Sequence, residues 1–250
     1  MVNKSHMRQS TATLQAFYNS RLGAAVGHRV RERVSDLWGA CDRQSVLGIG
    51  YSLPVLQLWQ SEQQTCLAAI PEDMHQRATP SQAARRVVIT PDHRLPFNDS
   101  EFDKIILMHA LEEAEHPRHL MREAWRVLAP EGRMIVIVTN RRGVWSLNDG
   151  CAFGHGQPWT RGQLSQFLSD GLFQVTASST AVFMPPVDWY LVTSASRLLE
   201  RTGERLLPSF GGLILIEAVK RIYAEPDHRA PEQVYEAKTS RQGGSAMLKY

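Results

Sequence analysis

Two glycines in a short apolar stretch are the first residues in this chain whose spacing could serve chemistry. Residues 45–58 place Gly48 and Gly50 shortly before Ser52 and Pro54. Glycine lets the backbone turn sharply or approach a ligand closely, and proline suits the first turn of a helix. The stretch therefore predicts a buried strand, a tight turn and a helix start. Such a junction is how α/β proteins cradle nucleotide-like ligands.

Three further polar residues each follow or end a predicted strand. Glu72 comes shortly after one apolar run, Asp92 after the next, and His109 at the end of a third. His109 could act as a general base or be a packed histidine bonded to a backbone carbonyl. Asp92 could contact a ligand or form an Asx-type turn before Pro96.

A long glycine- and aromatic-rich loop follows the fifth predicted strand. It carries Trp145, His155, Trp159 and Arg161. Aromatic rings with histidine and arginine could hold a planar or anionic substrate, or they could pin the loop to the surface. The acidic residues at 112–115 beside His116 are interpreted as the first turns of a helix, where carboxylates favour the positive end of its dipole. No metal site is predicted, since no cysteine or second histidine pair completes a ligand set.

Hydrophobic periodicity indicates which elements must position these residues. A basic, amphipathic helix over 14–38 is predicted, with breaks near Gly23 and Gly27, as a lid over a ligand or as a solvated cover for the sheet. Strands then alternate with helices over short connections, which favours βαβ units and a parallel sheet covered on both faces. The predicted order is strand 46–49, helix 55–60, strands 65–70, 87–89 and 102–109, helix 111–128, strand 134–138, helix 163–169, strand 172–183, helix 187–201 and strand 212–223.

Composition is that of an ordinary globular chain. It has 250 residues, is 43% hydrophobic and 21% charged, and carries a net charge of +3, which suits one domain and argues against a nucleic-acid partner. Three widely spaced cysteines indicate a reduced, cytoplasmic protein. No apolar run is long enough to span a bilayer. The charged tail 224–250 is expected to be loose.

Three segments between residues 87 and 140 carry a resemblance to a known family. Leu95-Pro96-Phe97 precedes Phe102-Asp103, and residues 126–133 read Arg-Val-Leu-Ala-Pro-Glu-Gly-Arg. In this order they resemble the class I S-adenosylmethionine-dependent methyltransferases of the type-11 kind. The resemblance implies an α/β, Rossmann-like, doubly wound seven-stranded sheet that is mostly parallel with the last strand antiparallel. Its core would cover 45–223, after a helical extension at 1–40.

The resemblance also implies a function and a cofactor. The protein would transfer a methyl group from S-adenosylmethionine to an unidentified acceptor, most simply a small molecule. The loop after the fifth strand resembles a bacterial subset. Cofactor contacts would come from Gly48, Gly50, Ser52, Glu72, Asp92 and His109, catalysis from His109, and substrate contacts from Trp145, His155, Trp159 and Arg161.

Departures from the family pattern leave a second function open. The family usually has an acidic residue where Gly48 stands and glycines where Ser52 and Pro54 stand, and no carboxylate ends the second strand. The alternative is a catalytically degenerate protein that acts as a binding or regulatory module through a protein partner. A dinucleotide-binding protein is the weaker rival, because the G-x-G-x-x-G pattern is absent.

Overall fold

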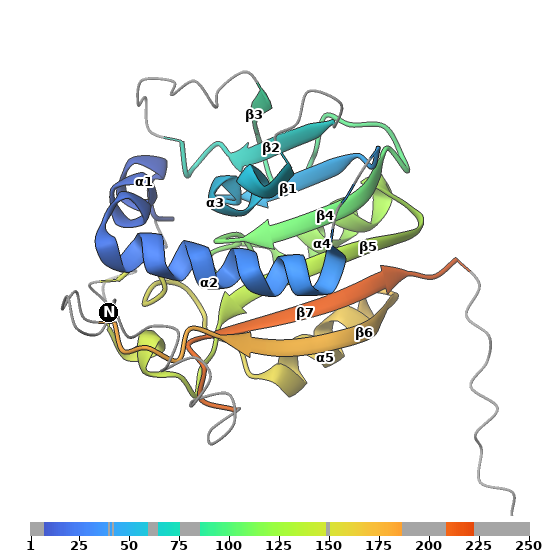
Figure 1. The fold of residues 1–250 in the computed structure, drawn as a ribbon. Coiled ribbons are helices and arrows are strands. Elements are labelled where there is room, and N and C mark those ends of the chain that lie inside the picture. Colours follow the sequence, from blue (N-terminus) through green and yellow to red (C-terminus); the bar gives the residue numbers. More distant parts are fainter. Residues whose placement is uncertain are drawn as a thin grey trace, which may run out of the picture.

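The computed structural model describes residues 8–39, 41, 43–59, 65–75, 86–148, 151–186 and 209–222. Seven strands form one sheet in the order β3-β2-β1-β4-β5-β7-β6 (Figure 1). The strands are β1 Val46–Gly50, β2 Cys66–Pro71, β3 Val87–Thr90, β4 Phe102–Met108, β5 Leu128–Thr139, β6 Phe173–Ala181 and β7 Leu213–Lys220.

Strand direction confirms the predicted fold class. β1 pairs in parallel with both β2 and β4, and β4 pairs in parallel with β5. β7 runs antiparallel between β5 and β6. Ile105, Ile106 and Leu107 of β4 are all buried, as expected for a strand that is covered on both faces.

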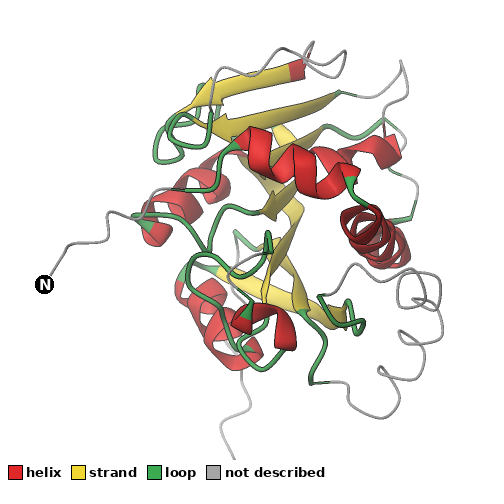
Figure 2. Cartoon of the chain, turned by 90° about the vertical axis from the view of Figure 1, so that its left-hand side faces the viewer, coloured by secondary structure: helices red, strands yellow, loops and turns green. Residues whose placement is uncertain are grey.

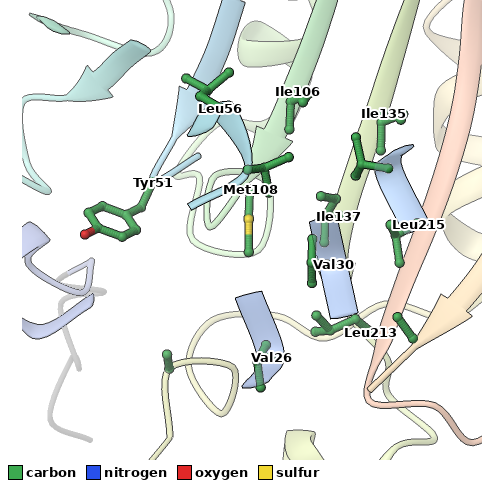
Figure 3. Packing of buried hydrophobic residues seen from close by; sticks show 14 of the residues in the cluster. Val26, Val30, Tyr51, Leu56, Ile106, Met108, Ile135, Ile137, Leu213 and Leu215 are labelled. Atoms are coloured by element: carbon green, nitrogen blue, oxygen red, sulfur yellow. The ribbon is translucent and has the colours of Figure 1, made fainter. Parts of the chain in front are cut away.

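Helices cover both faces of the sheet, and their side chains form two apolar clusters. One cluster joins α2 to alternate strand residues such as Ile106, Ile135 and Leu215 (Figure 3). The other joins α4 and α5 to the intervening residues, among them Ile105 and Val136. Figure 2 shows the same elements from the side on which α1 lies. The helical elements are α1 Thr11–Asn19, α2 Arg21–Trp38, α3 Leu53–Leu56, η1 Gln57–Trp59, α4 Pro117–Val127, η3 Val144–Leu147 and α5 Arg161–Asp170.

The predicted helix over 14–38 is in fact two helices that meet at Ser20. The Ser20 hydroxyl donates to the carbonyl of Phe17 (2.7 Å) and accepts the Gly23 N–H (3.0 Å), so this one residue ends α1 and caps α2. A Cβ at Gly23 would lie 1.9 Å from the Phe17 carbonyl oxygen. Gly23 therefore allows the close crossing of the two helices and does not break one.

The predicted helix over 111–128 is wrong in its first six residues. α4 begins only at Pro117, and residues 111–116 form an irregular turn after β4. The carboxylates at 112 and 113 therefore do not lie in a first helical turn, and a helix dipole does not explain them. The predicted helix 187–201 and the tail 224–250 lie outside the described residues. Among the helices that the structure does describe, none has the length and apolar character to cross a bilayer.

Candidate functional site at the carboxyl edge of the sheet

The turn after β1 lies where the parallel strands end, as predicted. Gly50 has a φ of +80°, and a Cβ there would lie 2.4 Å from the Met108 carbonyl oxygen. A Cβ at Gly48 would lie 2.0 Å from the Ser52 hydroxyl oxygen. At both positions, therefore, the absence of a Cβ allows the backbone to pack closely against a neighbouring part of the chain. The Ser52 hydroxyl is buried over Gly48 and has no hydrogen-bond partner among the described residues.

His109 is the next predicted site residue at this edge. It is 2% exposed and has a φ of +51°, an uncommon backbone conformation that often marks functional positions. Its Nε2 lies 2.8 Å from the Tyr18 hydroxyl, and its ring lies 4.5 Å from that of Phe153. Burial lowers the pKa of His109 to about 3, so the imidazole is neutral at physiological pH.

Two tyrosines complete an aromatic wall around His109. Tyr18, from α1, stacks on Tyr51 of the β1 turn with ring centroids 5.8 Å apart. Burial raises the pKa of Tyr18 well above its ordinary value and that of Tyr51 to about 12. Both phenols are therefore protonated. When the proton of His109 is on Nδ1, its Nε2 accepts a hydrogen bond from the Tyr18 hydroxyl.

The segment before α1 crosses the ends of several strands, which the sequence did not predict. The Gln9 N–H donates to the Glu113 carboxylate (2.8 Å), and the Gln9 side-chain amide donates to the Ala152 carbonyl (2.8 Å). The Thr11 N–H donates to the Met74 carbonyl (2.9 Å). In Figure 1, α1 lies beside the carboxyl ends of β1, β2 and β4. No spacing in the sequence signals these contacts.

Asp92, and not Glu72, is the predicted carboxylate that the structure brings into this network. Asp92 Oδ2 pairs with Nη2 of the buried Arg8. Glu72 is exposed in the turn after β2, and its neighbour Asp73 faces Arg8 instead, with Oδ2 at 3.1 Å from Arg8 Nε. The sequence named Glu72 and Asp92 as cofactor contacts, whereas the structure brings Asp73 and Asp92 to Arg8 and leaves Glu72 exposed.

Glu112 is a buried acid in the turn after β4. Glu112 is 6% exposed, and its Oε2 has no hydrogen-bond partner among the described residues. Burial raises its pKa to about 8, so the carboxyl is largely protonated at neutral pH. The Glu112 carbonyl accepts the Gln157 N–H (2.7 Å), which ties the loop after β5 to the turn. Within the described residues, no three His, Cys, Asp or Glu side chains are grouped as metal ligands.

The four predicted substrate residues do not converge. Trp145 is fully buried in the α2-side cluster, and its indole donates to the Met184 carbonyl (2.8 Å). Trp159 packs on Phe167 in the cluster on the other face. His155 and Arg161 are exposed. Trp145 therefore anchors its loop, while Trp159 lines a separate hollow of about 500 Å³ beside α5.

The residues at this edge fit a nucleoside-containing cofactor in their chemistry. Of the seven buried side-chain polar atoms without a hydrogen-bond partner among the described residues, three belong to residues at this edge, namely Arg8 Nη1, Ser52 Oγ and Glu112 Oε2. Buried polar groups are normally hydrogen-bonded, so unpaired ones indicate a missing ligand or ordered water. Carboxylates beside the ends of β2 and β3 supply acceptors for hydroxyl or amino groups.

Comparisons with known proteins agree with this fold. Residues 46–136 match the family model described as a methyltransferase domain, type 11. The chain is similar to an uncharacterized protein of Methanocaldococcus jannaschii, 39% identical over 56 residues, which are 22% of this chain and 27% of that protein. The chain thus spans about a quarter of that curated relative's length.

Two solved structures extend the likeness to most of the chain. A SAM-dependent methyltransferase of Thermotoga maritima has a TM-score of 0.58 and 14% identity, with 83% of this chain and 94% of that chain covered. A Haloferax volcanii methyltransferase in complex with the Trm112 methyltransferase activator also has a TM-score of 0.58, with 17% identity and coverage of 84% and 97%. At these identities the likeness shows the fold.

The match over residues 46–136 and the shared fold agree with the resemblance to the class I S-adenosylmethionine-dependent methyltransferases of type 11 that the sequence shows. S-Adenosylmethionine is the cofactor of this class. When bound, it supplies a methyl group already activated on a sulfonium. An enzyme of this class has to bind the cofactor, align an acceptor and, where needed, accept the acceptor's proton.

Proposed function

We propose that the chain transfers the methyl group of S-adenosylmethionine to a small-molecule acceptor bound near His109. The observation that carries the proposal is the meeting of the Gly50 turn, Asp92 and His109 at one edge of a sheet with this strand order. That edge is where open α/β sheets bind their ligands. The turn would hold the methionine part of the cofactor, and the carboxylates beside β2 and β3 its nucleoside part.

The side chains around His109 favour an uncharged acceptor with a planar or apolar body. The rings of Tyr18 and Phe153 contact the imidazole, and Tyr51 stacks on Tyr18. Burial holds His109 neutral, since its pKa is lowered to about 3, and a charged acceptor would have to be desolvated there without an opposite charge. His109 would orient the acceptor with Tyr18 and take up its proton only if Tyr18 released Nε2.

A binding or regulatory role remains the second candidate, and two observations favour it. β2 ends at Pro71 without a carboxylate, and the His109 Nε2 that a base would use is engaged by Tyr18. A protein with this role would act through a partner, much as the Haloferax volcanii relative was found with an activator protein. In either role, a cytoplasmic setting is supported by Cys41 and Cys66, which are buried and form no disulfide.

The proposal is tested by calorimetric titration with S-adenosylmethionine and S-adenosylhomocysteine. We expect Asp92→Asn to weaken binding of either ligand about tenfold, the loss of roughly one charge-assisted hydrogen bond. Asp170→Asn, on the exposed end of α5, should bind as the wild type does. Gly50 is a poor probe, because any side chain there would strike the Met108 carbonyl before it reached a ligand.

Absence of binding by the wild type at millimolar ligand would exclude the enzyme. Binding of both ligands without methyl transfer to any low-molecular-weight fraction would instead support the regulatory role. Transfer of a labelled methyl group to such a fraction, lost in Asp92→Asn and kept in Asp170→Asn, would support the proposed function.

A further inference from the structure

Apolar side chains are exposed together at one corner of the molecule, beside the carboxyl end of β5. Among the described residues, seven large apolar side chains are strongly exposed. Three of these seven belong to two short segments, the helix η3 and the residues before β7, and we call them the apolar tip: Val144 (52% exposed), Leu147 (83%) and Phe210 (54%). Single exposed apolar residues are ordinary, whereas a group of them marks an interaction surface.

The two segments that carry the apolar tip are held together by hydrogen bonds. Asn140 Nδ2 donates to the carbonyls of Ser209 (2.9 Å) and Gly211 (2.7 Å), the residues on either side of Phe210. A Cβ at Gly143 would lie 2.8 Å from the Gly211 carbonyl oxygen. Because η3 directly follows Gly143, it begins against the segment before β7. In Figure 1 this corner lies at the left, the side on which α1 lies beside the other strand ends.

The helix η3 turns its apolar side to solvent because its other side is anchored. In a 3₁₀ helix, side chains three residues apart lie on the same side, so Val144 and Leu147 point in one direction. Trp145, between them, is fully buried, and its indole donates to the Met184 carbonyl (2.8 Å). The fold therefore holds the two exposed side chains outward from a fixed base.

Two arginines directly precede η3 and lack an acidic partner. Arg141 and Arg142 are both exposed, and neither guanidinium forms an ion pair with another described residue. The described residues at 139–148, 181–186 and 209–214, which make up this corner, include no aspartate or glutamate. The apolar tip is therefore flanked by positive charge alone.

We propose that the apolar tip and these two arginines form a docking surface for an anionic lipid bilayer. The apolar side chains enter the boundary between headgroups and acyl chains, and the guanidinium groups bind lipid phosphates. A second copy of this chain fits less well, because it would bring four unpaired arginines together. A folded protein partner also fits less well, since a stable protein interface buries roughly 800 Å² on each side, and three protruding side chains fall short of that area.

The docking surface lies at the same edge of the sheet as the candidate functional site. β4 and β5 are parallel, so His109, after β4, and the arginines, after β5, follow the same ends of the two strands. Docking turns this edge toward the bilayer, where an uncharged, apolar acceptor would concentrate. The inference goes beyond the proposed function and does not depend on it, because a chain without catalysis would still dock.

Sedimentation with sucrose-loaded vesicles tests the inference on the full chain. We expect binding to vesicles of phosphatidylcholine and phosphatidylglycerol in equal parts, and at least tenfold weaker binding to phosphatidylcholine alone, which lacks the anionic lipid. Leu147→Ser should weaken binding to the mixed vesicles about tenfold or more, because it removes a leucine side chain from the lipid. Arg142→Gln should weaken it about fivefold and reduce its dependence on salt.

Leu172→Ser and Arg43→Gln are the matched controls. Both residues are exposed at the opposite edge of the sheet, before β6 and β1, and both variants should bind as the wild type does. A second measurement reports insertion directly. The indole of Leu147→Trp should be quenched by brominated phosphatidylcholine in the mixed vesicles, and that of Leu172→Trp should not. Leu147 is so exposed that neither of its substitutions disturbs the core.

Three results would overturn the inference. The first is a wild type that does not bind the mixed vesicles, and the second is an equal loss of binding in Leu147→Ser and Leu172→Ser. The third is dimerisation in the ultracentrifuge that Leu147→Ser abolishes, without vesicle binding, which would assign the apolar tip to a second copy. Vesicle binding by a chain that binds no S-adenosylhomocysteine would keep the docking surface and exclude the enzyme. Methyl transfer without vesicle binding would do the reverse.

Discussion

Burial sets the charge of the residues at the candidate site. It lowers the pKa of His109 to about 3 and raises that of Glu112 to about 8, while Tyr18 is held protonated. Three groups that could carry charge are therefore neutral at pH 7. The desolvation penalty for an ion explains all three shifts. Their neutrality is the reason for proposing an uncharged acceptor.

Glu112 should make the stability of the protein fall as pH rises. An ordinary ion-paired acid has the opposite effect. Between about pH 4.5 and 8 the unfolded chain has this carboxylate ionised while the folded chain keeps it protonated. The unfolded state then binds fewer protons, so stability falls as pH rises through this window. Relative to Glu112→Gln, the wild type should lose about 1.4 kcal/mol per pH unit there, measured by urea unfolding.

His109 contributes in the other direction, and the comparison with Glu112→Gln removes its effect. Its lowered pKa costs stability as pH falls from about 6.5 to 3, in both proteins alike. Glu115→Gln is the matched control, because Glu115 is exposed in the same turn. A difference between wild type and Glu112→Gln that stays flat from pH 5 to 8 would show that Glu112 is ionised in the folded protein.

At the level of elements, strands were easier to predict than the turns that carry the site. Apolar, β-branched runs such as 102–108 place a strand from sequence alone, because both faces must be buried. The turn at 111–116 was mistaken for helix, because its alanine, leucine and glutamate residues are good helix formers. Pro117 was the available signal for the true start of α4, since proline favours the first helical position. The break at Ser20 had a capping serine as its signal.

The β1 turn gives an element-scale prediction about Gly50. Gly50→Ala combines an unfavourable φ of +80° with a Cβ that would lie 2.4 Å from the Met108 carbonyl and 2.9 Å from that of His109. Gly39→Ala, at the end of α2, has a φ of +61° but nothing within 4 Å of its Cβ. Gly39→Ala should cost about 1–3 kcal/mol of stability from strain alone. Gly50→Ala should cost about 2 kcal/mol more, because the overpacking adds to the strain.

Thermal and urea unfolding of the two variants measure this difference. Equal losses would mean that the backbone of β4 yields easily at Met108 and His109, and that the junction of β1 with β4 is soft. A larger loss for Gly50→Ala would show a rigid junction, as a fixed ligand-binding edge requires.

Across the whole molecule, the sequence failed to predict those site residues whose contact partners lie far away along the chain. The turn after β1, Asp92 and His109 could be named from the sequence through its resemblance to a known family. Arg8 and Tyr18 could not, because their partners lie 84 and 91 residues away, and periodicity reports only which face of an element is apolar. The same limit applied to the loop after β5, whose tryptophans lie on opposite faces of the sheet.

The N-terminal segment and the strand ends should therefore respond to the cofactor as one unit. Saturating S-adenosylhomocysteine should slow amide hydrogen exchange at Gln9 and Thr11, whose N–H groups bond to Glu113 and Met74. We expect at least a tenfold slowing, because bound ligand must leave before these bonds open. Amides of α5 near Leu168, on the far side of the sheet, should exchange less than twofold more slowly. Faster exchange at Gln9 on binding would mean that the ligand displaces the segment, and it would place Arg8 among the groups that block the site.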